Sequence, residues 1–431
     1  MLPEHLKVNE EGHLEIGGCD TVDLAEQFGT PLYVMDESLI RRICRDYKDS
    51  FAMYYQGKGT PVYASKAFCC KEMCRIVKSE GLDLEIVSGG ELYTALAAGF
   101  DPAHIHFNGN NKTCDEIRYA LEQNVGHILV DNIEELHMIQ KYGEVMDRVT
   151  PVSLRIKPGI DAHTHQFIRT GQIDSKFGFA LETGEAMQAV KETLALPNLQ
   201  LRGVQCHIGS QIFDIAPFEE AAWVMLHFMD DVRKETGYTI ELLDLGGGFG
   251  IRYTDADEPV PYRDYMQQVS KVVHDTCREL SLPVPYIYIE PGRSVVGEAG
   301  LTLYTVGSVK EIPGVRNYVS VDGGMTDNPR YILYQSSYDV LLANHADKAP
   351  DYTATIAGRC CESGDLIQEN VKMVKPKAGD LVAVLATGAY NYSMASNYNR
   401  VNRPPVIMVR GGTPRVVVRR ESYEDLVRND L

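Results

Sequence analysis

Residues 61–80, PVYASKAFCCKEMCRIVKSE, join a short apolar run to an amphipathic one. The first part, Pro61–Ser65, has the length and apolar content of a buried strand, and Lys71–Glu80 repeats apolar residues at helical spacing. The same order of strand and helix recurs as far as Arg293, which predicts a parallel sheet with crossover helices. The expected strands are Pro61–Ser65, Leu84–Ser88, His104–Phe107, His127–Asp131, Val152–Ile156, Gly203–His207, Glu241–Leu245 and Tyr286–Glu290.

Eight units of this kind are typical of an α/β fold, the (β/α)8 barrel of TIM type. A doubly wound sheet is the alternative, but the early G-x-G-x-x-G turn that would favour it is missing from the sequence.

The pattern changes after about Gly297. Short apolar runs there are separated by Gly, Pro, Asp and Asn, and helical periodicity is scarce, which predicts a mostly β domain of sandwich or barrel type. The first 36 residues also contain strand-like pieces, and we expect them to pack with this second domain. The predicted division is a barrel over residues 37–297 and a β domain formed by residues 1–36 together with residues 298–431.

The composition excludes several classes of protein. A formal net charge of −18 over 431 residues argues against nucleic acid or an anionic membrane as a partner. The start of the chain is acidic and polar, without the pattern of a signal peptide, and no run approaches the length of a membrane span. Ten cysteines without a C-x-x-C pair suggest neither a metal site nor a disulfide framework, so we expect reduced thiols in a cytoplasm.

Reactive side chains in a barrel come from the carboxyl ends of the strands. Lys66 follows the first strand, where desolvation would lower the pKa of its amine and make it a nucleophile toward an aldehyde. His207 follows the sixth strand and could stack on a flat ring. Glu290 ends the eighth strand and could pair with a protonated pyridine nitrogen. Considered alone, each has an alternative without function: a solvated loop residue for Lys66, a core histidine for His207 and a structural ion pair for Glu290.

Glycines follow the seventh strand in Gly246–Gly250, and the loop after the eighth strand contains Pro291-Gly292-Arg293. Loops seven and eight form the usual phosphate site of a barrel, because their backbone N–H groups can point at the anion. A tight turn without a ligand is the alternative for the first loop, whose spacing does not fit a dinucleotide fingerprint.

The expected β domain contains three further candidates. Cys361 lies in the polar stretch Cys361–Asp365, which is an unusual place for a residue that is normally a small apolar core residue. Arg330 follows a glycine-rich turn and suits a substrate carboxylate, although a surface arginine is the alternative. The segment Gly388–Ser393 could offer a tyrosine hydroxyl to a phosphate.

These motifs, in this order, closely resemble those of the diaminopimelate decarboxylase family, which are fold-type III pyridoxal-phosphate (PLP) enzymes. The resemblance covers nearly the whole chain. It is carried by residues 63–68 (YASKAF), 87–92 (VSGGEL), 158–165 (PGIDAHTH), 175–178 (SKFG), 206–211 (CHIGSQ), 246–248 (GGG), 290–293 (EPGR), 322–325 (DGGM), 361–365 (CESGD) and 388–390 (GAY).

The resemblance implies that Lys66 holds PLP as a Schiff base, that Asp83 helps to set the charge of this lysine, and that His207 stacks on the ring. Glu290 would hold the pyridine nitrogen, and Cys361, from a partner subunit, would protonate the carbanion after CO₂ leaves. The expected catalytic residues are thus Lys66, His207 and Cys361. The residues expected around the cofactor, mostly its phosphate, are Ser210, Gly247, Gly248, Pro291, Gly292, Arg293 and Tyr390.

The implied reaction converts meso-2,6-diaminopimelate to L-lysine. Arg293, Arg330 and Tyr334, with Tyr390 nearby, would hold the distal carboxylate, and Glu362 the distal amine. The resemblance also implies a homodimer with shared active sites. The alternatives are a related decarboxylase for ornithine, arginine or carboxynorspermidine, a racemase, and a regulatory relative without cofactor. Two departures from the family pattern, at Tyr331 and at Cys360, affect the substrate loops without removing a residue that carries a role.

Overall fold

The computed structural model describes residues 2–160 and 174–431 and divides the chain into two compact units. One unit contains Ile43–Gly250 and Pro259–Gly292. The other contains the described part of residues 1–42 together with Ile251–Glu258 and Arg293–Leu431. The second half of the predicted motif Pro158–His165 lies outside the described residues.

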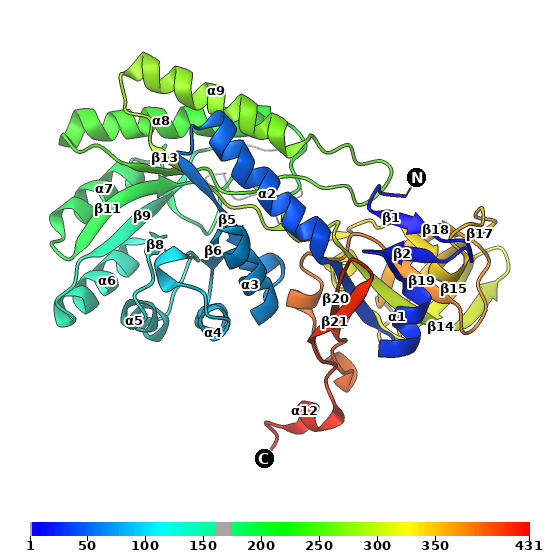
Figure 1. The fold of residues 1–431 in the computed structure, drawn as a ribbon. Coiled ribbons are helices and arrows are strands. Elements are labelled where there is room, and N and C mark those ends of the chain that lie inside the picture. Colours follow the sequence, from blue (N-terminus) through cyan, green and yellow to red (C-terminus); the bar gives the residue numbers. More distant parts are fainter. Residues whose placement is uncertain (1, 161–173) are drawn as a thin grey trace. The chain divides into compact units, whose positions relative to one another are not determined.

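The first unit is a closed barrel of eight parallel strands (Figure 1). The ring closes because β8 pairs with β9, and the two-residue strand β10 (Phe179–Ala180) adds to the edge of β9. The predicted barrel is therefore confirmed. Its strands are β5 (Gly59–Ala64), β6 (Asp83–Ile86), β7 (Ile105–Phe107), β8 (His127–Val130), β9 (Thr150–Lys157), β11 (Leu199–Gln205), β12 (Leu242–Asp244) and β13 (Tyr286–Ile289).

Helices cover the outside of this ring, which explains why β6, β7 and β8 are buried along their whole length. The sequence starts several of these helices with an N-cap: Ser88 Oγ accepts the N–H of Glu91, and Thr113 and Glu116 form a capping box. Figure 1 shows the following helices around the strands. They are α2 (Glu37–Tyr54), α3 (Lys71–Glu80), α4 (Gly89–Ala97), α5 (Cys114–Glu122), α6 (Ile133–Val145), α7 (Glu185–Ala195), α8 (Ala216–Thr236) and α9 (Tyr262–Leu280).

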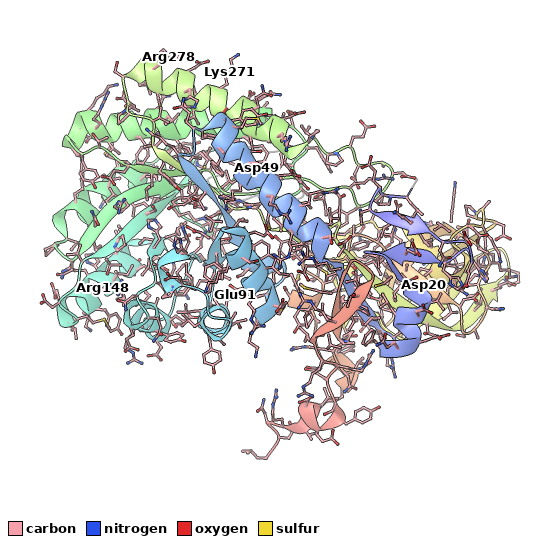
Figure 2. The ribbon with its side chains drawn as sticks, in the orientation of Figure 1. Asp20, Asp49, Glu91, Arg148, Lys271 and Arg278 are labelled. Carbon is pink, nitrogen blue, oxygen red and sulfur yellow. The ribbon has the colours of Figure 1, made fainter. Side chains whose placement is uncertain are left out.

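Helix α9 illustrates how the helices are divided between core and solvent. Its Tyr265, Met266 and Val273 are buried, whereas Lys271 and Arg278 point away from the strands (Figure 2). None of the helices within residues 2–160 and 174–431 combines the length and the apolar character that crossing a bilayer requires.

The second unit is built on a nine-stranded sheet. Its long strand β14 pairs with β4 and β19 in its first half and with β15 in its second half. The N-terminal strand β4 lies between β14 and β20, so the start of the chain is part of the same sheet as its end. The strands are β4 (Leu32–Asp36), β14 (Gly300–Ile312), β15 (Arg316–Val321), β16 (Val340–Leu342), β17 (Tyr352–Ala357), β18 (Leu366–Met373), β19 (Leu381–Val384), β20 (Val406–Arg410) and β21 (Thr413–Val418).

Smaller elements complete this unit, and buried side chains form two hydrophobic clusters in it. One cluster contains Tyr253, Tyr304 and Tyr338. The other joins the N-terminal strands to Leu301 and Ile407. The smaller elements are β1 (Leu6–Val8), β2 (Leu14–Ile16), β3 (Cys19–Asp20), α1 (Thr21–Phe28), α10 (Arg293–Val296), α11 (Arg330–Tyr334) and α12 (Tyr423–Val427).

Candidate active site

Lys66 lies in a single helical turn, Ser65–Ala67, immediately after β5. The lysine is exposed, while both of its neighbours are buried. The turn is fixed at both ends, because the hydroxyl of Tyr63 donates to the carbonyl of Phe68 and the N–H of Ala64 donates to the carbonyl of Pro291. The barrel therefore presents Lys66 at the carboxyl end of its strands, as predicted for a residue that binds a cofactor.

Glu290 follows β13 directly and is 5% exposed. Its Oε2 accepts the side-chain N–H of Gln205 at 3.0 Å, whereas Oε1 has no hydrogen-bond partner among the described residues. Burial raises the pKa of Glu290 well above its usual range, and the carboxylates of Asp244 and Glu85 raise it further. A buried acceptor without a partner, in a surplus of negative charge, suits a cationic N–H such as that of a pyridinium ring.

His207 follows β11, and its Nδ1 accepts the backbone N–H of Gly247 at 3.3 Å. This nitrogen is therefore unprotonated. Burial lowers the pKa of the imidazole well below its usual value, and the positive charges of Lys66 and Arg155 add to the effect. The ring is neutral at pH 7, which suits a flat surface for stacking better than a proton donor.

The loops after β11, β12 and β13 touch one another through their glycines. A side chain on Gly247 would lie 2.1 Å from the carbonyl oxygen of Glu290, and one on Gly248 would lie 2.4 Å from that of Gly209. A side chain on Gly292 would meet Ala64 and Ala67. Only glycine fits at Gly247 and Gly248, so the backbone of these loops is open to close approach by a phosphate, although the N–H of Gly247 itself donates to His207. Ser210, partly buried, lies in the first of the three loops.

The structure corrects the prediction for Asp83. This residue begins β6, and its carboxylate binds Nδ1 of His104 at 2.9 Å and Nε2 of His106 at 3.0 Å. It lines a cavity of about 470 Å³ that is surrounded by the amino ends of the barrel strands, away from the end that carries Lys66. The residue at the height of the lysine is Glu85, two positions further along the same face of the strand.

Glu85 is a buried acid that was not among the predicted site residues. It is fully buried, its Oε1 accepts the side-chain N–H of Asn108 at 2.6 Å, and its Oε2 has no partner among the described residues. Two further polar residues of this end, Gln205 and Arg155, were also missed as site residues. Their signal was in the sequence, since both lie at or near the carboxyl end of an expected strand, but their residue types do not by themselves indicate a cofactor.

Four predicted residues of the second unit come together. Arg293 and Arg330 begin α10 and α11 and are almost completely buried. The guanidinium of Arg293 lies 4.8 Å from the ring centre of Tyr390, and that of Arg330 lies 5.7 Å from the rings of both Tyr334 and Tyr390. Such contacts stabilise buried cations. Nε of Arg330 has no partner among the described residues.

A fifth residue, Tyr253, was not predicted. Its hydroxyl oxygen accepts N–H groups from both Arg293 and Arg330. No motif contains Tyr253, and only the folded structure brings it to the arginines.

Cys361 and Glu362 are exposed in the loop between β17 and β18. Asp365 fixes this loop, because its carboxylate accepts the N–H groups of Cys360 and Met325 at 2.7 and 2.6 Å. The two adjacent thiols differ clearly. Cys360 is buried, which raises its pKa to about 11, whereas Cys361 reaches solvent. The accessible thiol is therefore that of Cys361.

The fold and the group around Lys66 define a class of protein, and comparison with known sequences names it. Residues 37–297 match the family described as "Pyridoxal-dependent decarboxylase, pyridoxal binding domain". The matched residues include Lys66, His207, the glycine loops and Glu290.

Relatives match over the whole length. Diaminopimelate decarboxylase from Bacillus subtilis is 50% identical, with 98% of this chain and 96% of that protein covered. The Staphylococcus aureus enzyme of the same name is 46% identical, with 99% of each covered. A crystal structure of diaminopimelate decarboxylase from M. jannaschii in complex with L-lysine is 35% identical and superimposes with a TM-score of 0.91 over 99% of this chain and 98% of that one. The chain belongs to the diaminopimelate decarboxylase family, whose cofactor is PLP.

Proposed function

We propose that this protein decarboxylates meso-2,6-diaminopimelate to L-lysine and CO₂. The observation that carries the choice of substrate is Arg330. It is a guanidinium with 5% exposure and an unpartnered Nε, and it lies beside a second buried arginine. A pair of buried cations with a free donor suits a carboxylate that remains on the substrate after the reaction. Ornithine and arginine have no such group at their far end.

The residues at the carboxyl end of the barrel fit PLP. Lys66 would hold it, the glycine loops with Ser210 would bind its phosphate, and we assign Tyr390 to the same phosphate from its place in the family motifs. When bound, PLP withdraws the electron pair that the departing CO₂ leaves behind. Glu290 would keep a proton on the ring nitrogen, and the neutral ring of His207 would stack on the cofactor ring. Glu85 adds negative charge beside Glu290.

Product analysis tests the proposed reaction. The protein loaded with PLP should release CO₂ from meso-diaminopimelate and form L-lysine, while ornithine, arginine and carboxynorspermidine should react at least about a hundredfold more slowly in kcat/KM. Lys66→Ala should abolish both turnover and the visible absorbance of the bound cofactor. Full activity in that variant, or a preference for ornithine, would overturn the proposal.

We assign the protonation of the product carbon to Cys361 and the binding of the distal amine to Glu362, both contributed by the second subunit of a homodimer. The support is the exposure of both side chains in a loop that Asp365 holds rigid, together with the buried state of Cys360. An exposed thiol can act as an acid on a substrate that it meets across an interface.

A mixed dimer tests the shared site. Lys66→Ala and Cys361→Ala chains, each nearly inactive alone, should recover up to about a quarter of the wild-type activity per subunit after mixing and re-association. This recovery is expected because one of the two sites in each heterodimer then contains both wild-type residues. Absence of recovery in a verified heterodimer would place Cys361 and Lys66 of one site in the same chain.

We also propose that the protein works in the cytoplasm. All ten cysteines are free thiols, as expected in a reducing compartment, and the net charge of −18 favours solubility. Cell fractionation would test the location.

A further inference from the structure

We propose that Tyr253 determines substrate specificity by bridging Arg293 and Arg330 and holding the two guanidinium groups in the arrangement that recognises a carboxylate. The inference rests on the proposed function and adds to it a residue outside every motif described above. Tyr253 is a positioning residue in this view, because it acts on the substrate through the two arginines.

The bridge is made by one oxygen atom. Nη1 of Arg330 donates to the hydroxyl oxygen of Tyr253 at 2.7 Å, and Nη1 of Arg293 donates to the same oxygen. A phenol oxygen has two lone pairs, so both are used by cations. Hydrogen bonds from cations are the strong ones, and two of them on one oxygen favour the phenolate. Burial opposes this effect, but the two arginines outweigh it and lower the pKa of Tyr253.

The ring and the backbone of Tyr253 are held independently of the arginines. The ring belongs to a hydrophobic cluster and meets Tyr338 edge to face, with 5.5 Å between the ring centres. The backbone N–H donates to Asp257 at 3.0 Å, and the carbonyl accepts the N–H of Asp339 at 3.1 Å. The hydroxyl is therefore at a fixed point, and the arginines adjust to it.

The fixed position of the Tyr253 hydroxyl would explain why the enzyme selects a substrate with a distal carboxylate. Two buried guanidinium groups repel one another, and without an acceptor between them they would separate. With the bridge in place, Arg330 is anchored through Nη1 and still has an unpartnered Nε. A free donor on an anchored guanidinium can bind a carboxylate without first losing another partner, which lowers the cost of ordering on binding.

Tyr253→Phe removes only the bridging oxygen and leaves the packed ring. In the PLP-loaded enzyme we expect KM for meso-diaminopimelate to rise at least about tenfold, with kcat changed by less than about threefold, because a lost hydrogen bond to a charged group weakens binding by roughly this amount. The matched control is Tyr304→Phe. It removes a buried hydroxyl from the same hydrophobic cluster, but that hydroxyl donates to Asp327 and not to an arginine.

Two ligands separate a specific role from a general loss of structure. L-Lysine and cadaverine (1,5-diaminopentane) differ by one carboxylate, and their dissociation constants can be measured by calorimetry on the PLP-loaded protein without any turnover. In Tyr253→Phe, lysine should bind at least about tenfold more weakly, with little change for cadaverine. Tyr304→Phe should leave the ratio of the two constants unchanged.

The possible failures are distinct. If the wild-type protein does not prefer lysine over cadaverine, the proposed substrate is wrong. If it does, and Tyr253→Phe keeps the preference, or loses affinity for both ligands equally, or loses the cofactor absorbance, then Tyr253 does not determine specificity.

Discussion

The two ends of the barrel contain similar polar residues but use them differently. At the amino end, Asp83 binds two histidines, and further pairs join Thr60 to Tyr286 at 2.7 Å and His127 to Ser153 at 2.6 Å. At the carboxyl end, one side-chain oxygen of each of Glu85, Gln205 and Glu290 has no partner among the described residues. Nδ1 of His106 and Oγ1 of Thr150, the first residue of β9, are exceptions at the amino end.

This difference separates residues that stabilise the fold from residues that bind a ligand. A buried polar group without a partner destabilises the protein by about 1–3 kcal/mol, so several at one place indicate that something else normally binds there. The cavity at the amino end is also lined by histidines and an arginine, yet the polar groups that line it are mostly paired with each other. Burial and charge are therefore weaker signals of function than an unpaired donor or acceptor.

Glu290→Gln should give the largest effect that this comparison predicts. The substitution keeps the size of the side chain but removes the charge that would hold a proton on the ring nitrogen. We expect kcat to fall about a hundredfold, the size of effect seen when one electrostatic group is removed from an active site. The visible absorbance of bound PLP should remain, because Lys66 and the glycine loops are intact. Steady-state kinetics and a spectrum of the same sample check both points, and a kcat within threefold of wild type would contradict the assignment.

Two matched substitutions on strand β6 test the difference between the two ends of the barrel. Glu85→Gln and Asp83→Asn each turn a buried carboxylate into an amide, and the two positions are two residues apart on one face of the strand. We expect Glu85→Gln to lower kcat about tenfold and Asp83→Asn to leave it within about twofold.

Stability should respond in the opposite way. Asp83→Asn weakens two hydrogen bonds to histidines, so its free energy of unfolding in urea should fall by about 1–3 kcal/mol. If Asp83→Asn proves to be the variant with low kcat and normal stability, the two ends of the barrel do not differ in the way proposed.

The error at Asp83 shows what the sequence could and could not predict. Eight alternating units predicted the barrel and the ends of its strands, so the sequence could predict that Lys66, His207 and Glu290 lie at the carboxyl end. The sequence of a strand three or four residues long does not show, however, which of its residues lies at which end. A difference of two residues moves a side chain from one end of the barrel to the other. Tyr253 could not be found at all, because its role depends on a contact with Arg330, 77 positions later in the chain.

Asp244 ends β12 in register with Gln205, and its substitution should have the smallest effect. Burial raises the pKa of this carboxyl from 3.8 to about 6, whereas the N–H of Gly246, at 2.8 Å, lowers it in part. A raised pKa means that the folded protein keeps a proton that the unfolded chain loses. This contribution to stability is complete below about pH 4 and is lost as the pH rises through about 6. Between pH 4 and 6.5 the free energy of unfolding should therefore fall in both proteins, but less in Asp244→Asn. The difference between the two falls should be on the order of 1–2 kcal/mol. Urea titrations of both proteins across this range measure the slope. An unchanged slope would mean that Asp244 titrates normally, and that the carboxylates at the carboxyl end are less strongly coupled than their burial implies.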